Sequence, residues 1–342
     1  MRHTSFPTTF ALLLLLAAGC GSETVSPTPS PDSLRQDGLW TASGSPSTIL
    51  RLNSEQLSGR GVREPVTEIT TSSARLFTLL GIAFDPAGNL WLASEDDSLL
   101  LSFSAGALSG SGERTPAKVI APVDRSLVGP AALAFDALGR LWVANRRNGT
   151  VVRYDATQLA AGGSVAPAVV LSVPGNPSAL AFDTAGSLWI SDSRFQWIIK
   201  YSAAQLEASG APAATFVLTR FASALVNPGG LAFDGQGNLW VANTGAGNLL
   251  AFSRARLAGN GPVAPDIVIT STGGSLSIPV GLAFDGSGNL WVMGGAGALT
   301  QYAAGSLGGG GLLAPSAQLE IPGHTLFWSL AFWPRPAGLP VN

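Results

Sequence analysis

Hydrophobic and polar positions follow a pattern that returns five times along the chain. Each copy has a short apolar run ending in Ala-Phe-Asp, a polar turn of the type Asp-x-x-Gly-Asn, and a second apolar run close to Leu-Trp-Val-Ala. The copies lie near residues 82, 133, 180, 231 and 282, and their phenylalanines are spaced 51, 47, 51 and 51 residues apart. These phenylalanines are Phe84, Phe135, Phe182, Phe233 and Phe284. Such spacing predicts a repeat architecture with one supersecondary unit per copy.

Each copy is predicted to hold four short strands. The aspartate of the polar turn is interpreted as a turn former, since Asp and Gly supply the turn geometry. A third strand carries an aromatic residue, and a single capped helical turn that ends at a glycine follows it. The glycines are Gly112, Gly163, Gly210, Gly261 and Gly311. The fourth strand begins near a proline in most copies, which predicts that it forms the outer edge of the unit.

The two ends of the chain supply complementary parts of a further unit. Residues 39–70 hold three strands but lack the first, whereas residues 329–333 hold a first strand alone, with Phe332 placed 48 residues after Phe284. Pairing these ends would close a ring without an exposed edge. The sequence therefore predicts an all-β, six-bladed β-propeller over residues 38–334, with four strands per blade and the C-terminal strand joining the N-terminal blade. An open solenoid with frayed ends is the alternative, and residues 335–342 form a tail.

The N-terminal residues have the pattern of a secretion signal. A short charged start precedes an apolar run that is too brief to span a bilayer. Ala17-Ala18-Gly19-Cys20 resembles the lipobox of bacterial lipoproteins, in which the cysteine is lipidated and becomes residue one of the mature chain. We expect a signal peptide at 1–19 and, at 20–37, the lipidated Cys20 with a Ser/Pro/Thr-rich tether. The alternative is an ordinary signal peptide that contains a cysteine.

Composition and net charge limit the kinds of partner that the chain can bind. The net charge is −2 and only 12% of residues are charged, so the chain lacks the basic surface that nucleic acid requires. The single cysteine excludes an intramolecular disulfide. We expect a monomer whose partners are the lipid bilayer, through acylated Cys20, and an unknown small molecule or protein. Gly21 after Cys20 favours the outer membrane of a bacterial cell envelope over the inner one.

The core Asp-x-x-Gly-Asn-Leu-Trp-Val-Ala-Asn resembles that of NHL repeats and of the related gluconolactonase/senescence-marker group. The resemblance covers nearly all of residues 39–333. It implies the propeller fold. It does not imply one activity, because one scaffold carries lactonases, lyases and plain binding modules.

One face of the predicted ring carries variable links, from strand two to three and from each blade to the next, and we call it the variable face. Binding residues concentrate on such loops. The position after Leu-Trp-Val-Ala is expected to ring the channel mouth there. Its residues are Ser43, Ser94, Asn145, Asp192, Asn243 and Gly294. The candidate ligand-binding rim lies on blades two to four and comprises Glu95, Asp96, Asn145, Arg146, Asp192, Arg194, Trp197 and Asn243. Solvated loop residues with incidental charge are the alternative interpretation.

Relatives of the gluconolactonase type bind a divalent cation at the channel mouth through a glutamate, an asparagine and an aspartate. The resemblance places Asn145 and Asp192 as two of these ligands, with Glu95 as the third from a different place in its blade. Oxygen ligands suit a hard cation such as calcium. This resemblance is partial, because no first strand carries a glutamate.

No catalytic signature is visible. His324 is the only histidine left after signal removal, and a lone histidine without a recognisable partner is usually structural. Six of the nine tryptophans occupy the repeated position, whereas Trp197, Trp328 and Trp333 do not. The favoured function is a membrane-anchored, extracytoplasmic binding module that uses the rim of blades two to four. The alternative is a divalent-metal-dependent hydrolase of lactone type.

Overall fold

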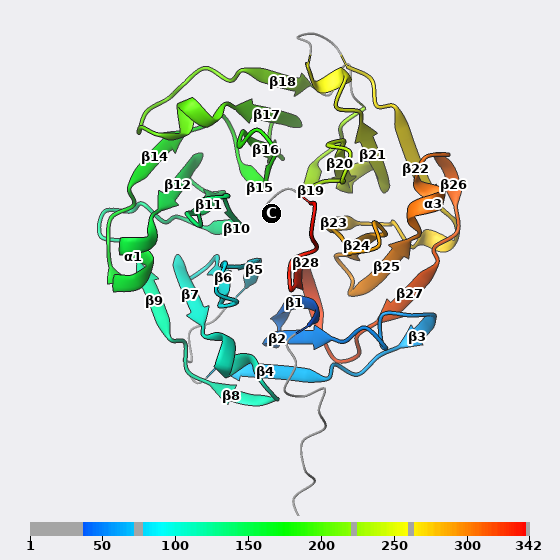
Figure 1. The fold of residues 1–342 in the computed structure, drawn as a ribbon, viewed down its shortest axis with the longest axis horizontal. Helices are drawn as coiled ribbons and strands as arrows, with labels where there is room; N and C mark the ends of the chain where they lie inside the picture. The colour runs from blue at the N-terminus through cyan, green and yellow to red at the C-terminus, as the bar shows by residue number, and fades with distance from the viewer. Residues whose placement is uncertain (1–36, 72–77, 220–223, 259–262, 340–342) are drawn as a thin grey trace, which may run out of the picture.

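The computed structural model describes residues 37–71, 78–219, 224–258 and 263–339. These residues form six β-sheets arranged in a ring, which confirms the predicted six-bladed β-propeller (Figure 1). The predicted signal, Cys20 and the predicted tether up to residue 36 lie outside the described residues. No helix in the described ranges is long and apolar enough to cross a membrane.

Each blade has four antiparallel strands ordered from the centre outwards. From blade one to blade six, the inner strands are β28 (Thr325–Trp333), β5 (Leu79–Phe84), β10 (Pro130–Phe135), β15 (Pro177–Phe182), β19 (Pro228–Phe233) and β23 (Pro279–Phe284). The second strands are β1 (Gly38–Ser45), β6 (Leu90–Ser94), β11 (Leu141–Asn145), β16 (Leu188–Asp192), β20 (Leu239–Asn243) and β24 (Leu290–Gly294). The third strands are β2 (Ser47–Leu52), β7 (Leu99–Phe103), β12 (Thr150–Tyr154), β17 (Trp197–Tyr201), β21 (Asn248–Phe252) and β25 (Ala298–Tyr302). The fourth strands are β4 (Thr67–Thr71), β9 (Lys118–Ala121), β14 (Val169–Ser172), β18 (Phe216–Thr219), β22 (Ile267–Ser271) and β27 (Ala317–Glu320).

The C-terminal strand closes the ring as the sequence predicts. β28 pairs antiparallel with β1, with Phe332 opposite Leu39 and Ala331 opposite Trp40. The first and last strands of the described chain, β1 and β28, thus lie side by side in blade one (Figure 1). This pairing excludes the open solenoid, because no inner strand is missing from the ring.

A single helical turn follows the third strand in five blades, as predicted. These turns are η2 (Ala105–Leu108), α1 (Ala156–Ala161), η3 (Ala203–Leu206), η5 (Arg256–Ala258) and α3 (Ala304–Leu307). The capping is visible at α1, where the side chain of Gln158 accepts a hydrogen bond from the backbone N–H of Asp155 at 2.8 Å. Two further turns, η4 (Thr244–Ala246) and η6 (Thr272–Gly274), lie in links on the variable face.

The outer edge differs from the prediction. Three of the glycines expected only to end the helical turns instead begin short strands, which pair in parallel with the fourth strand of the preceding blade. These strands are β8 (Gly112–Arg114), β13 (Gly163–Ser164) and β26 (Gly311–Leu313), and blade one has an equivalent strand, β3 (Arg60–Val62), which pairs with β27. At the fourth strand of blade three a single bridge from Gly210 does the same, and Gly261 lies outside the described residues. In these blades the fourth strand is the outermost strand of its own blade, and a segment of the next blade pairs with its outer edge. This pairing protects an edge that would otherwise be exposed.

The aspartate of each turn does more than form the turn. In blade five, Oδ1 of Asp234 accepts hydrogen bonds from the backbone N–H groups of Gln236 and Asn238, at 3.0 and 2.9 Å. Its Oδ2 accepts one from the indole Nε1 of Trp240 at 3.0 Å. Blades two, three, four and six repeat this Asp–Trp bond. The spacing Asp-x₅-Trp therefore fixes the orientation of a buried tryptophan.

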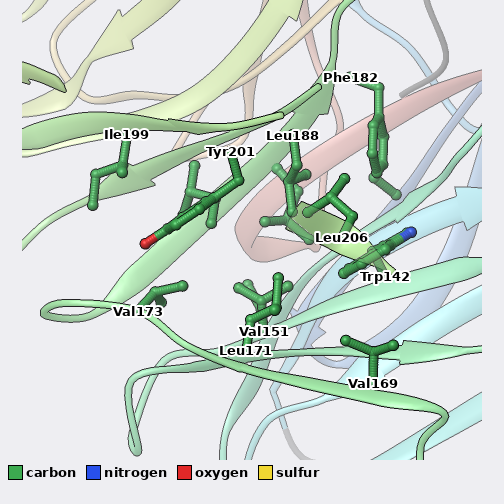
Figure 2. Close-up of a cluster of buried hydrophobic side chains, with 14 residues drawn as sticks. Trp142, Val151, Val169, Leu171, Val173, Phe182, Leu188, Ile199, Tyr201 and Leu206 are labelled. Carbon is green, nitrogen blue, oxygen red and sulfur yellow. The ribbon is translucent and has the colours of Figure 1, made fainter. Parts of the chain in front are cut away.

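That tryptophan contacts the next blade. In every blade the tryptophan ring meets edge-on a phenylalanine at or next to the end of the following inner strand, at centroid distances from 5.8 to 6.5 Å. The last contact, between Trp291 and Phe332, joins blade six to the strand that closes the ring. Around these pairs lie interblade clusters of aliphatic side chains, such as the one between blades three and four that contains Trp142, Phe182 and Leu206 (Figure 2).

We predict that Asp234→Ala lowers the free energy of unfolding by about 2–3 kcal/mol. The substitution leaves the buried indole N–H of Trp240 without its acceptor and removes the bonds that hold the turn. Urea unfolding followed by tryptophan fluorescence measures the change. Glu113→Ala, at an exposed position of β8, is the control and should stay within about 0.5 kcal/mol of the parent. Equal stability of the two variants would contradict the assigned role of Asp234.

Candidate functional site

A cavity of 480 Å³ occupies the centre of the ring. Its wall comes from the inner strands of all six blades, which are rich in glycine and alanine. Gly230 illustrates why, since a Cβ there would lie 2.8 Å from the carbonyl oxygen of Val280 on the next inner strand. Small residues let the inner strands converge around the channel.

The middle of the wall is a ring of aliphatic side chains, one from each inner strand. Its members line the cavity and are between 4% and 7% exposed. They are Ile82, Leu133, Leu180, Leu231, Leu282 and Leu330. We call this set the aliphatic ring. The lining of the channel is therefore mainly apolar at this ring, which favours apolar ligand groups over ions there.

The residues expected at the channel mouth are placed elsewhere. Ser43, Ser94, Asn145, Asp192 and Asn243 are fully buried, and Gly294 has no side chain. The next residue along the chain lines the cavity in blades three to six, namely Arg146, Ser193, Thr244 and Gly295. The expected register was therefore wrong by one position, and neighbouring residues at a strand end point in opposite directions.

The buried residues tie each preceding link to its blade. The Asn145 amide donates to the carbonyl oxygen of Ser126 at 2.8 Å and accepts from the N–H of Val128 at 3.2 Å. Asn243 makes the equivalent pair of bonds in blade five, with Ala224 and Val226. These amides replace backbone partners that the links would otherwise lack.

Asp192 performs the same task with a carboxylate. Its two oxygens accept hydrogen bonds from the N–H groups of Asn176 and Phe195, each at 2.6 Å. Burial away from water raises the pKa of Asp192, and the backbone N–H groups of Phe195 and Asn176 offset only part of that rise. Burial thus makes the charged form of the Asp192 carboxyl group less stable in the folded protein than in water.

Blade two contributes an ion-pair cluster to the rim. Arg147 lies 2.5 Å from Asp96 and 3.4 Å from Glu95, between nitrogen and oxygen atoms. Thr78 donates a further hydrogen bond to Asp96 at 2.7 Å. The bonds from Arg147 and Thr78 lower the pKa of Asp96. The charges of this part of the rim are largely satisfied by one another.

The other two arginines of the rim, Arg194 and Arg146, each lie over an aromatic ring. Phe195 stacks on Trp197 with ring centroids 4.9 Å apart, and the guanidinium of Arg194 lies 5.2 Å from the Phe195 ring. Arg146 of blade three lies 5.8 Å from the ring of Trp328 in blade one. Trp328 was seen in the sequence only as a tryptophan outside the repeat, because no pattern links it to a residue two blades away.

The proposed cation ligands have other partners. The carboxylate of Glu95 pairs with Arg147, and the oxygens of Asn145 and Asp192 accept backbone hydrogen bonds. Among the described residues, no group of three His, Cys, Asp or Glu side chains could hold a metal ion. These three residues do not fit a calcium ligand set as they stand, and the cation stays a prediction from the resemblance.

His324 lies apart from the cavity, in the link before β28. Its Nδ1 is 2.8 Å from the carbonyl oxygen of Pro322, and its Nε2 is 3.4 Å from a carboxylate oxygen of Glu68 in β4. Neither residue lines the channel. The geometry gives this histidine contacts within blade one and its flanking link.

Comparison with known proteins supports the fold. No protein-family model matches the sequence, and no curated protein matches it. Among solved structures, a chain of the nidogen/laminin complex is similar over 85% of this chain and 96% of its own, with 16% identity and a TM-score of 0.57. Virginiamycin B lyase from Staphylococcus aureus is similar over 78% of each chain, with 12% identity and a TM-score of 0.54. The extracellular domain of BT4673 from B. thetaiotaomicron is similar over 72% of this chain and 31% of its own, with 20% identity and a TM-score of 0.50.

These structures are β-propeller proteins, and so is this chain. At such identities the likeness concerns the fold alone. It fits the NHL and gluconolactonase resemblance broadly and selects no activity within it.

We predict that Asp192→Asn changes how stability depends on pH. A native pKa above the ordinary value of 3.8 means that the folded state binds the proton more tightly, so the stability of the parent falls as pH rises from 3.8 through the native pKa. The variant lacks this decline. Urea unfolding at pH values below and above 3.8 measures the difference. Asp96→Asn is the matched control, because that pKa is lowered and the difference should have the opposite slope. Parallel pH profiles for parent and Asp192→Asn would refute the assignment.

Proposed function

We propose that this propeller is an extracytoplasmic binding module that recognises a partner through the variable-face rim of blades two to four. The observation that carries the proposal is the assembly of exposed Arg194 and Phe195 on half-buried Trp197 in blade four. Phe195 is 40% exposed although it is a large apolar residue. It is held by stacking on Trp197, so little side-chain freedom would be lost on binding.

The charge on this rim favours an acidic partner. Glu95 and Asp96 are paired with Arg147. Arg194 and Arg146, in contrast, form no ion pair with any carboxylate in the described ranges and lie over aromatic rings. Aromatic and arginine side chains are the residue types that carry most of the binding energy at protein interfaces. The partner that we propose is an acidic polypeptide segment with an apolar side chain for Phe195.

The structural neighbours are compatible with such a role. One is described as an extracellular domain and another is part of a protein complex. Neither description concerns this chain, and the proposal rests on the rim itself.

A displayed library of random peptides, selected against the chain carrying Cys20→Ser so that it is free of lipid, tests the proposal. We expect the selected peptides to be rich in Asp and Glu. We expect Phe195→Ala to weaken their binding about thirtyfold, which corresponds to loss of a central interface residue. Arg194→Ala should also weaken peptide binding, and the loss should be larger at low salt than at high salt.

Leu312→Ala is the matched control, because Leu312 is a 67% exposed apolar residue on the outer edge strand β26, far from the rim in the ring (Figure 1). The selected peptides should bind this variant as tightly as the parent. Peptides that bind Phe195→Ala and the parent equally well, or that carry no acidic residues, would rule out the proposed surface.

We also propose that Cys20 anchors the protein to a bacterial outer membrane. The full chain expressed in a bacterium fed with a labelled fatty acid should incorporate the label, and Cys20→Ser should abolish the incorporation. An acyl chain anchors through burial of its methylene groups, about 0.8 kcal/mol each. Equal label in the parent and in the Cys20→Ser chain would contradict the anchor.

A further inference from the structure

The central cavity has the dimensions and the lining of a small-molecule site. Its volume of 480 Å³ lies within the range of about 300–1,000 Å³ that such sites span. Each of the six inner strands contributes one residue of the aliphatic ring to its lining, so every blade offers an apolar side chain to a ligand in the channel.

Three hydroxyl groups along the wall already donate hydrogen bonds to backbone oxygens. Thr244 donates to the carbonyl oxygen of Pro279 at 2.6 Å, and Ser329 donates to that of Leu80 at 2.6 Å. Ser178 donates to the carbonyl oxygen of Asn176 at 3.0 Å. Because these donors are already satisfied by backbone oxygens, an apolar group can enter without leaving them unpaired.

One end of the channel carries a cation without a counterion. Arg146 is half-buried, lines the cavity at the variable face, and lies over Trp328. Its neighbour Arg147 takes both nearby carboxylates, Glu95 and Asp96, so in the described part of the chain Arg146 has no ion-pair partner. A partly desolvated guanidinium binds a carboxylate with bidentate geometry when one is offered.

We propose that the channel binds an amphiphilic carboxylate, with its head group paired to Arg146 at the variable-face mouth and its apolar chain within the aliphatic ring. This ligand class matches both features of the site, the aliphatic ring in the wall and the half-buried Arg146 guanidinium at the variable-face end. The inference goes beyond the proposed function, because the cavity lining contains neither Phe195 nor Arg194, although Arg146 borders both surfaces.

The opposite end of the channel sets the orientation of the ligand. The segment after β28 lines the cavity there with Arg335, Pro336 and Leu339. Leu339 also packs against the cluster between blades five and six. Arg335 is exposed, so water competes with any pairing to it, whereas Arg146 is half-buried against Trp328. The head group is therefore assigned to Arg146.

Isothermal titration of the Cys20→Ser chain with dodecanoate, kept below its micelle concentration, tests the proposal. We expect saturable binding with one site per chain. Dodecyltrimethylammonium, which has the same chain and the opposite charge, should bind at least about tenfold more weakly. Arg146→Met should weaken dodecanoate about tenfold, as expected for loss of one charge-assisted contact, and Arg146→Lys should restore part of it.

Three further variants separate the channel from other surfaces. Arg335→Met, at the opposite end, and Phe195→Ala, on the rim, should bind dodecanoate like the parent. Ala179→Phe places a larger side chain at a position that lines the cavity and should abolish binding. Because Ala179 also packs against the cluster between blades four and five, a thermal melt checks that the variant is folded. Should that variant fail to fold, Ala132→Phe fills the same cavity from blade three.

The proposal is overturned if dodecanoate does not bind, if both charges bind alike, or if the filled variants bind like the parent. Loss of binding in Arg335→Met rather than in Arg146→Met would overturn the assigned orientation. Because Phe195→Ala leaves this binding intact, failure here and failure of the peptide-binding rim remain separate results.

Discussion

The edge-on contact between a tryptophan of one blade and a phenylalanine of the next is the interaction on which the ring depends. It occurs at all six blade junctions with closely similar centroid distances. Aromatic pairs of this geometry contribute about 0.5–1.5 kcal/mol beyond the area that they bury. Each contact needs a correctly placed neighbour, so the junctions are cooperative around the circle. Phe332 at the C-terminus completes the last junction, which makes strand β28 essential for closure.

The central cavity is a consequence of the same packing. The tryptophan–phenylalanine pairs set the spacing between blades, and the inner strands converge only as far as their glycine and alanine residues allow. Where Gly230 faces Val280 the backbones are already in contact. The side chains that point inwards are then left to define the channel, and every blade supplies one aliphatic residue. The aliphatic ring thus follows from the packing of the inner strands, whether or not a ligand binds. The charge at the mouth of the channel, in contrast, comes from residues of the links.

Much of the fold could be predicted from the sequence, because the Asp-x₅-Trp spacing is repeated and each copy encodes a turn and a buried contact. Ring closure followed from the complementary ends. The fifth, parallel strands could not be predicted, because their glycines carry no side-chain pattern and their partners lie in another blade. The site was predicted less well. Asn145 and Asp192 were placed at the mouth, but a shift of one residue at a strand end exchanges the two sides of the sheet. The contact of Arg146 with Trp328 joins blades three and one and leaves no periodic signal.

The adjacent residues Arg146 and Arg147 show how the links turn a uniform scaffold into an uneven surface. Arg147 points outwards and is neutralised by carboxylates of blade two. Arg146 turns to the channel, where it forms no ion pair with a carboxylate of the described residues and lies over an aromatic ring. Blades five and six offer Thr244 and Gly295 at the corresponding positions, so their side of the mouth is small and uncharged. An anion that enters from the variable face therefore meets a guanidinium on one side of the mouth. This asymmetry orients a ligand within a ring whose walls are nearly equivalent, because the inner strands alone provide no such direction.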